Sequence, residues 1–387
     1  MSKSNFDLHR WVHRCLTLLL LTLIGTQVQA VAADGYSATA RYFPDGPEYS
    51  ARQANRLAAA NAALTQCREK HQQDPGYCDL IRQSDLQLHT SESLKAAVPR
   101  DRYPLYLWRV QGQQRVIYLA GSIHLLKPGF YPLPPQYEAA FAAASHLVVE
   151  VDTEKLSPNF VQQKSLQYGS LPADTALSQV LPAELYTELG ATLSQYGVSI
   201  ALFERFKPSL INQQLTLLAL MSVGYDPELG LESYFRARAR DKAILELESF
   251  EFQLDLLLNA PLTTQVDITR DMLAQMPEFE KLTAQMVGAW LTGDDQAFAE
   301  VFARQQGESA RVRAFNRALI EERNHTMTDT IVGYLNAPAG TATSTYFVLV
   351  GAAHLIGPEG IPSLLTKAGY APRRIYSDQR IATPVTQ

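Results

Sequence analysis

Two short apolar segments of the chain end in the same four-residue pattern, Gly-x-x-His. The segment VIYLA leads to Gly121 and His124, and the segment YFVLV leads to Gly351 and His354. Short runs with β-branched or aromatic residues that end in glycine predict buried strands followed by turns. Each histidine then lies at or just beyond the carboxyl end of a strand, the edge where open α/β sheets bind ligands. Either could also be an ordinary turn residue, but the repetition favours a shared site.

The pattern around the first motif predicts a hairpin and then a parallel α/β unit. Strands are expected at 103–110 and 115–120, with the polar loop QGQQ between them. Helical periodicity follows at 136–145, and the apolar run at 146–152 predicts the next strand. The order strand, helix, strand is typical of parallel α/β units.

The middle of the chain is predicted to be mainly helical. Helical periodicity dominates residues 177–239, a short strand is expected at 243–248, and Ser249 is the expected N-cap of the next helix. A long helical stretch with a break near 292–294 then leads to the second motif. Both motifs are followed by a Pro/Gly turn. We therefore predict an α/β (α+β) fold with a central mixed sheet, built from two related Gly-x-x-His halves with a mainly helical insertion.

The first residues have the pattern of a secretory signal peptide. Basic residues, the apolar stretch at 16–24 and an A-x-A site ending at Ala32 predict that residues 1–32 are removed. Cleavage would also remove Cys15 and leave Ala33 as the new N-terminus, in the periplasm or outside the cell. No later apolar stretch is long enough to cross a bilayer, so we expect no stable membrane insertion after cleavage.

Residues 33–100 are predicted to form a helical N-terminal arm. Leu57, Ala60, Leu64 and Cys67 recur at helical spacing on one face. Cys67 and Cys78 are the only cysteines of the mature chain, and export to an oxidising compartment favours a disulfide between them. Two unpaired buried thiols are the alternative. Residues 101–387 would then form the main domain.

Composition excludes one large class of partner. The net charge of the 387-residue chain is −5, and 46% of its residues are hydrophobic. The hydrophobic content is enough for one large core or two unequal ones. Because a nucleic-acid-binding protein needs a basic surface, we expect no nucleic acid partner.

Glu150 joins the two histidines as a candidate metal ligand, because it interrupts an apolar strand. A buried carboxylate needs an ion pair, hydrogen bonds or a metal. Two neutral imidazoles and one carboxylate, His124, His354 and Glu150, would suit a divalent metal such as Mn, Co, Fe or Zn. The alternative is an edge strand on which Glu150 faces solvent.

Three further residues are candidates for a catalytic role. Glu248 ends the strand expected at 243–248, where it could be a general base, an additional ligand or a solvated loop carboxylate. Arg323 replaces an apolar residue on a helical stripe and could pair with an active-site acid, bind a substrate carboxylate or stabilise an oxyanion. Its alternative is a buried stem with the guanidinium in water. Asn324, next to it, is a weaker candidate.

In these segments the chain resembles the TraB/GumN family, which includes the Tiki-type metalloproteases. The resemblance spans about residues 103–378 and rests on an ordered set of motifs, YLAGSIH (118–124), FYPLP (130–134), LVVEVD (147–152), LESFEFQ (247–253), ERN (322–324) and VLVGAAH (348–354). It implies an α/β fold with two Gly-x-x-His halves and, for the Tiki branch, proteolysis that depends on Mn or Co. It also implies that His124, Glu150 and His354 lie at the metal, with Glu248, Arg323 and Asn324 nearby.

The function expected from these residues is metal-dependent hydrolysis by an exported protein. The reaction would be cleavage of a peptide or protein substrate by a metal-activated water. Signatures of other enzyme classes are missing, namely the His-Glu-x-x-His, Gly-x-Ser-x-Gly, P-loop and Gly-x-Gly-x-x-Gly motifs. The alternative is a periplasmic protein on the same fold that binds or regulates a peptide or a metal without catalysis.

Overall fold

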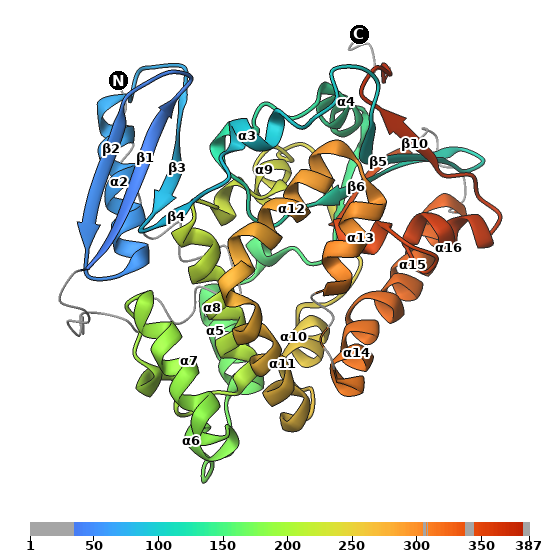
Figure 1. Cartoon of the computed structure of the whole chain (residues 1–387). Helices are drawn as coiled ribbons and strands as arrows, with labels where there is room; N and C mark the ends of the chain where they lie inside the picture. Colours follow the sequence, from blue (N-terminus) through green and yellow to red (C-terminus); the bar gives the residue numbers. More distant parts are fainter. Residues whose placement is uncertain (1–34, 305–306, 308, 337–343, 382–387) are drawn as a thin grey trace.

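The computed structural model describes residues 35–304, 307, 309–336 and 344–381. A small sheet with one helix lies at one side, a mainly helical part lies below, and a larger sheet lies at the other side (Figure 1). The predicted signal peptide, including Cys15, falls outside the described residues. Within those ranges, no helix combines the length and the apolar character needed to cross a bilayer.

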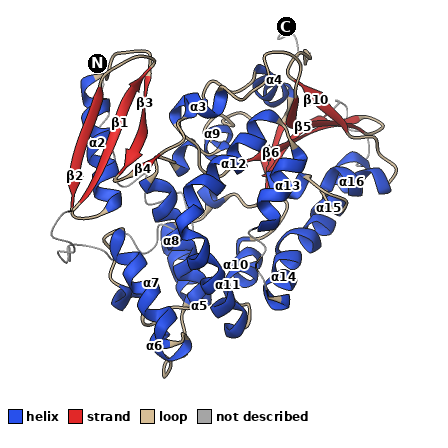
Figure 2. Cartoon of the chain, viewed as in Figure 1, coloured by secondary structure: helices blue, strands red, loops and turns tan. Residues whose placement is uncertain are grey.

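The N-terminal unit is an antiparallel sheet with one helix, and not the predicted helical arm. Its strand order is β2 (Glu48–Gln53), β1 (Tyr36–Phe43), β3 (Tyr77–Gln83), β4 (Leu86–Gln87), and α2 (Arg56–Lys70) packs on it (Figure 2). The helical spacing identified in the sequence belongs to α2 alone. The strands were missed because β1 pairs with β3 across more than thirty intervening residues, a contact that local periodicity does not record.

The predicted disulfide is present. Cys67 of α2 and Cys78 of β3 are bonded, and both side chains are buried. The bond therefore joins the helix of the N-terminal unit to the central part of its sheet.

The large sheet is mixed, as predicted, with the strand order β10, β5, β6, β9, β7, β8. The predicted hairpin is confirmed as β5 and β6, and β10 adds to it on the outside. The remaining neighbours, β6 with β9, β9 with β7 and β7 with β8, are parallel. The bounds are β5 (Pro104–Gln111), β6 (Arg115–Ser122), β7 (His146–Val149), β8 (Ala243–Glu246), β9 (Ser344–Gly351) and β10 (Arg373–Tyr376).

The two Gly-x-x-His strands lie side by side in this sheet. β6 and β9 pair along their whole length, with Gly121 opposite Val350 and Ser122 opposite Gly351. Because the strands are parallel, both motifs end at the same edge. The prediction that two related halves meet in one sheet is confirmed.

Helices connect the parallel strands and supply the insertion. The helix between β6 and β7 is α4 (Pro135–Ala143), and the segment between β7 and β8 contains α5 (Pro158–Gly169), α6 (Leu177–Val180), α7 (Ala183–Gln195), α8 (Pro208–Ser222) and α9 (Leu231–Arg236). After β8 come α10 (Phe250–Leu258), α11 (Leu262–Gln275), α12 (Phe279–Thr292), α13 (Asp295–Arg304), α14 (Ala310–Arg317) and α15 (Arg323–Asn336). The shorter helices are α3 (Ser91–Lys95) and α16 (Ile361–Lys367).

Local signals set the ends of several of these helices where the sequence predicts them. Ser249 caps α10 by accepting a hydrogen bond from the backbone N–H of Phe252. The predicted break near 292–294 occurs at Gly293, which ends α12 in the left-handed conformation at φ 70°. Pro208 begins α8. Proline suits the first position of a helix because a backbone N–H there would have no partner within the helix.

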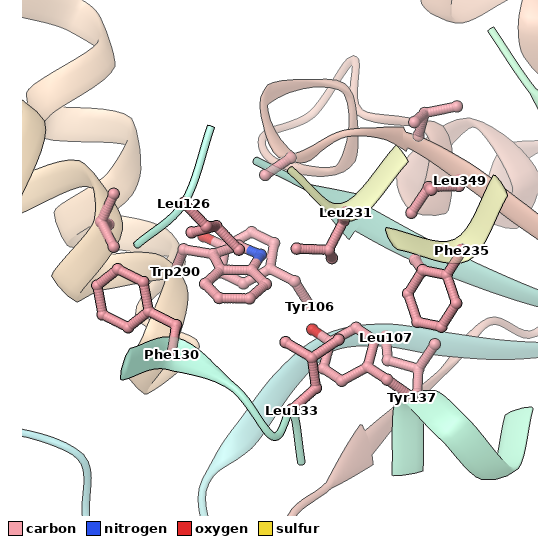
Figure 3. Close-up of a cluster of buried hydrophobic side chains, with 14 of the residues drawn as sticks. Tyr106, Leu107, Leu126, Phe130, Leu133, Tyr137, Leu231, Phe235, Trp290 and Leu349 are labelled. Atoms are coloured by element: carbon pink, nitrogen blue, oxygen red, sulfur yellow. The ribbon is translucent and has the colours of Figure 1, made fainter. Parts of the chain in front are cut away.

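The main core packs α4, α9 and α12 against the large sheet. Figure 3 shows Trp290, Tyr137 and Phe235 gathered over residues of β5 and β9. The Trp290 indole donates a hydrogen bond to the carbonyl of Gly121 at 3.0 Å, so its polar atom is satisfied in the core. This contact also fixes the end of β6, three residues before His124.

A buried lysine links the N-terminal unit to the segment after His124. Lys127 has no exposed surface, and its Nζ donates to the carbonyl of His89 at 2.8 Å. The same Nζ lies 3.4 Å from Asp79 of β3 and 4.9 Å from the centre of the Tyr225 ring. A buried cation requires such partners, so the small sheet and the main domain are electrostatically joined.

Candidate active site

The candidate site lies at the carboxyl edge of the four parallel strands. His124 follows β6, His354 follows β9, Glu150 follows β7 and Glu248 follows β8. Because these strands are neighbours in the sheet, their ends bring together residues that are far apart in the sequence. This is the edge at which open α/β sheets bind ligands.

Three of the predicted side chains converge around Gly351. A Cβ atom placed on Gly351 would lie 3.5 Å from His354 Cδ2, 3.6 Å from Glu150 Oε1 and 3.8 Å from His124 Nε2. The glycine has an ordinary backbone conformation, with φ −53°, so its missing side chain is not needed for the turn. What the glycine provides is space between two imidazoles and a carboxylate.

His354 is buried with its two ring nitrogens in different roles. The Asn324 side chain donates from Nδ2 to the carbonyl of Glu359 at 2.7 Å, so its Oδ1 is free to accept a hydrogen bond from His354 Nδ1, also at 2.7 Å. The proton of the neutral ring is therefore on Nδ1, and Nε2 keeps its lone pair. Burial lowers the pKa of His354 to about 4, which keeps the ring neutral.

His124 is held through the same ring nitrogen by a carboxylate that the sequence analysis missed. Glu232, in the first turn of α9, lies 2.9 Å from His124 Nδ1 and also accepts a hydrogen bond from Ser122. The Glu232 carboxylate raises the pKa of His124 to about 9. The imidazole is 66% exposed, so solvent and salt screen this pair.

The close approach of α9 explains why Glu232 can reach this histidine. A Cβ atom on Gly230 would lie 2.0 Å from the carbonyl oxygen of His124, so only glycine fits there. The neighbouring Leu231 N–H donates to the carbonyl of Ile123 at 3.2 Å. No local pattern in the sequence pairs residue 232 with residue 124, because the contact depends on the packing of two distant segments.

Glu150 lies just after the strand, and not within it as predicted. β7 ends at Val149, so alternation along the strand does not decide which way Glu150 points. Its carboxylate accepts hydrogen bonds from the Gly351 N–H at 2.8 Å, from Arg323 at 2.6 Å and from Gln253 at 3.1 Å. Burial alone would raise the pKa of Glu150, but His354, Arg323 and the Gly351 N–H lower it to about 2. The alternative of a solvated edge carboxylate is wrong.

Arg323 uses all of its hydrogen-bond donors within the protein. Its Nε donates to Glu248 at 2.9 Å, and its NH2 donates to Glu248 at 2.7 Å and to Glu150 at 2.6 Å. Its NH1 donates to the carbonyl of Leu319 at 3.1 Å and faces His354 Nε2 at 3.3 Å. Burial alone would lower the pKa of Arg323, but the Glu248 and Glu150 carboxylates outweigh this effect and raise the pKa above its usual value. The alternative with the guanidinium in water is therefore wrong.

A π-helical turn, Ala318–Glu322, precedes Arg323. Such turns are rare and occur often at functional sites. Here the turn comes between α14 and α15 and places the carbonyl of Leu319 where it accepts from the guanidinium.

Glu248 and Asn324 support other residues and do not face the cavity. Only 2% of the Glu248 side chain is exposed, and both of its oxygens accept from Arg323. Asn324 is 1% exposed and contacts His354 and the Glu359 backbone. The structure thus places both predicted residues next to the site, as positioning groups. Glu246, the last residue of β8, accepts a hydrogen bond from the Asp152 N–H and pairs with Lys155.

Two cavities meet at the site. One has a volume of about 500 Å³ and reaches Arg323 and His354, and the other has a volume of about 570 Å³ and reaches Glu232. His124, Glu150 and Gln253 line both of them. The convergent polar groups are therefore accessible from two sides.

The candidate metal ligands do not form a complete coordination site in this arrangement. Among the described residues, no group of three or more His, Cys, Asp or Glu side chains has the arrangement of a complete metal site. The donor chemistry nevertheless fits a divalent metal. Both imidazoles are held at Nδ1 by an oxygen, His124 Nε2 borders the space above Gly351, and His354 Nε2 lies 3.7 Å from Glu150 Oε1.

Comparisons with known proteins give one family match and a few distant relatives. The sequence model of the TraB/PrgY/gumN family matches residues 106–374. The protein described as uncharacterized protein YbaP from Escherichia coli (strain K12) is 26% identical over 253 residues, which cover 65% of this chain and 88% of that protein. An uncharacterized protein of Treponema pallidum (strain Nichols) is 24% identical over 199 residues, or 50% of this chain and 59% of that protein.

No solved structure shows a significant match to this chain. The family match nevertheless covers more than half of the chain and contains both Gly-x-x-His motifs, Glu150, Glu248 and Arg323. The chain therefore belongs to the TraB/PrgY/gumN family.

Proposed function

We propose that this protein is a metal-dependent hydrolase that cleaves peptide bonds. The observation that carries the proposal is the convergence of His124, Glu150 and His354 around Gly351, at the meeting point of two cavities. Perturbed titratable groups that converge in a cavity are typical of active sites. The groups also match those implied by the resemblance to Tiki-type metalloproteases.

His124 Nε2, His354 Nε2 and the Glu150 carboxylate would hold the metal, with Mn or Co favoured and Zn or Fe possible. A divalent ion there supplies Lewis acidity, lowering the pKa of a bound water and polarising a carbonyl group. Glu232 and Asn324 hold the Nδ1 atoms of the two histidines and fix the directions of their rings.

Arg323 and Glu248 keep the Glu150 carboxylate in place. Without the guanidinium, two carboxylates that share one buried site would repel each other. Glu248 is closed off from the cavity, which argues against its expected role as a general base. We assign it the role of orienting Arg323.

The exported location remains a proposal that two observations support. The first is the signal-peptide pattern of residues 1–32. The second is the Cys67–Cys78 disulfide, because structural disulfides persist in oxidising compartments. The substrate would then be a peptide or protein of the periplasm or the exterior, and neither nucleic acid nor a stable membrane insertion is part of the proposal.

The test uses purified protein spanning residues 33–387. Metal is removed with a chelator, Mn, Co, Zn and Fe(II) are added back singly, and binding is followed by calorimetry while a mixed peptide library is analysed by mass spectrometry. We expect metal binding and metal-dependent cleavage, both lost in His354→Ala. The control is His325→Ala, because His325 is 59% exposed and pairs only with Glu359 at the surface. Equal activity in the chelated protein and in the metal-loaded protein would exclude the proposal.

One observation favours a second function, a binding or regulatory protein without catalysis. Four of the five N–H groups of Arg323 donate to Glu248, Glu150 and the Leu319 carbonyl, and the fifth faces His354 Nε2, the atom that would bind the metal. Arg323 therefore has little capacity left to stabilise an oxyanion. In the experiment above, this function predicts that metal and peptides bind while every peptide remains intact.

A further inference from the structure

We infer that the substrate carries a bulky apolar side chain beside the cleaved bond, and that the cavity of about 500 Å³ next to His354 binds it. The inference rests on the proposed peptidase function and adds a substrate class to it. The cavity volume falls within the range of about 300–1,000 Å³ that is typical of small-ligand sites.

The walls of this cavity away from the site are mainly apolar, with the hydroxyl groups of Tyr225 and Thr283 among them. Leu257 of α10, Met286 of α12, Phe302 of α13 and the π-turn residues Leu319 and Ile320 line it. All five are partly exposed, so neighbouring side chains do not fully cover them. The cavity therefore offers an uncovered apolar surface inside a helical frame, a place where burial of an apolar group is favourable.

Charge within the lining is confined to the end that meets the site. Glu150 and Arg323 carry a fixed charge, His124 and His354 are the other ionisable side chains of the lining, and all four belong to the candidate site. A lysine or glutamate side chain of a substrate that entered farther would lose its hydration and find no oppositely charged partner in the lining there. The cavity therefore favours apolar side chains because their burial is favourable, and it disfavours charged side chains because they would lose their hydration.

The second cavity indicates that the bound chain continues past the site. This cavity, of about 570 Å³, shares His124 and Glu150 with the first; its lining is also mainly apolar but includes the side-chain amides of Asn212 and Gln213. A peptide that occupies both cavities places His124 and Glu150 beside one of its internal bonds. The apolar side chain beside the cleaved bond would lie on the His354 side, and the Asn212 and Gln213 amides would meet polar groups of the chain on the other.

The closing experiment compares peptides that differ at one position. Internally quenched peptides carry Phe, Leu, Ala, Lys or Glu at each position around the cleavage site found with the library, and kcat/KM is measured with the metal-loaded mature protein. We expect a preference for Phe and Leu over Lys and Glu of about tenfold or more at one position on one side of the bond.

Met286→Lys tests whether this cavity is the source of the preference. Lysine keeps the helix propensity and length of methionine but places a charge in the cavity. We expect it to reduce the advantage of the Phe peptide by about tenfold and to leave the metal-binding curve unchanged. The matched control is Leu202→Lys, since Leu202 is 42% exposed and lies outside both cavities.

A binding measurement makes the result independent of turnover. Titration of N-acetyl-phenylalaninamide and N-acetyl-lysinamide, followed by NMR, is expected to show tighter binding of the phenylalanine compound, and Met286→Lys should remove the difference. Cleavage without any apolar preference, or a preference unchanged in Met286→Lys, would overturn this inference alone. If no peptide is cleaved but the apolar compound binds at Met286, the peptidase proposal fails and the apolar site stands.

Discussion

Arg323 donates hydrogen bonds to both carboxylate oxygens of Glu248, although 75 positions separate the two residues. The same guanidinium reaches Glu150 and so holds two buried acids together. Spacing on the helix identified Arg323 as a charge on an apolar stripe, but it did not identify these partners.

Arg323→Ala should therefore impair both stability and activity. Removing one member of a buried ion pair typically costs about 3–5 kcal/mol, because the remaining charges lose their compensation. Urea unfolding of the metal-free protein measures this loss, and Arg317→Ala, at an exposed position of α14, is the control. An unchanged unfolding midpoint in Arg323→Ala would contradict the burial of this pair.

Gly351→Ala should remove function while leaving the fold intact. The added methyl group would lie at ordinary contact distance, 3.5–3.8 Å, from His354, Glu150 and His124, and would occupy the space between them. We expect loss of metal binding in calorimetry with a melting temperature close to that of the wild type.

Gly121→Ala, in the matching position of the first motif, should have the opposite effect. Its methyl group would lie 3.0–3.2 Å from Leu355, Tyr106 and the Ala352 backbone, which is too close for a packed core. A cost of about 1–3 kcal/mol is expected for such overpacking. If the two alanine variants lose stability equally, the separate roles of the two glycines are refuted.

His124→Ala and His354→Ala should each remove most of the bound metal, and the double variant should add little further loss. Two ligands of one ion are not independent, so their effects do not add. Plasma mass spectrometry gives the metal content, and circular dichroism checks that the fold is retained. Stoichiometric metal in both single variants, or additive losses, would mean that the histidines do not share a metal.

Glu232→Gln should weaken metal binding without unfolding the protein. The carboxylate that holds His124 Nδ1 becomes a neutral amide, and loss of such an outer partner typically reduces metal affinity by about 10–100-fold. Calorimetric titration measures the affinity, and Glu184→Gln on the exposed face of α7 is the control. A wild-type affinity in Glu232→Gln would show that Glu232 does not position His124.

Asp267 should make stability depend on acid pH. Its carboxylate accepts from Arg311 at 2.7 Å and from Arg270 at 2.9 Å, and these contacts lower its pKa in the folded protein. The unfolded state therefore takes up a proton first as the pH falls, so the stabilisation present near neutral pH is lost as the pH falls through the lowered pKa.

Asp267→Asn should accordingly be less stable than the wild type by about 1 kcal/mol at pH 7, because the arginines are partly exposed. The difference should shrink as the pH is lowered toward 3.5, as followed by urea unfolding at each pH. A difference that is the same at every pH would show that the charge of Asp267 does not contribute.

The sequence predicts the large sheet well because its signals are local. The runs that form β6 and β9 are apolar and end in glycine, and the caps at Ser249 and Gly293 act within a few residues. The N-terminal sheet was missed for the opposite reason. Its strands β1 and β3 contain polar residues and pair with each other across the intervening α2, a contact that the local sequence pattern does not record.

The site follows the same division. His124 and His354 were found because they follow apolar runs that end in glycine, and Glu150 was found because it interrupts the apolar run at 146–152. The ends of these strands meet at one edge. Glu232, Ser122 and Gln253 were not singled out, because each contacts the site through packing that brings distant segments together. The roles of Glu248 and Asn324 could likewise not be assigned, since burial and partner atoms decide them.

Lys127 restricts where a chimera between two members of the family can be joined. The family match begins at residue 106, yet the carboxylate that faces the Lys127 ammonium belongs to Asp79, in the sheet before that boundary. A chimera joined at residue 106 would bring a lysine into the interior and leave its counter-ion behind, at a cost of about 3–5 kcal/mol. The N-terminal sheet and the family domain must therefore be transplanted together, or position 127 must be changed to an apolar residue in the same step.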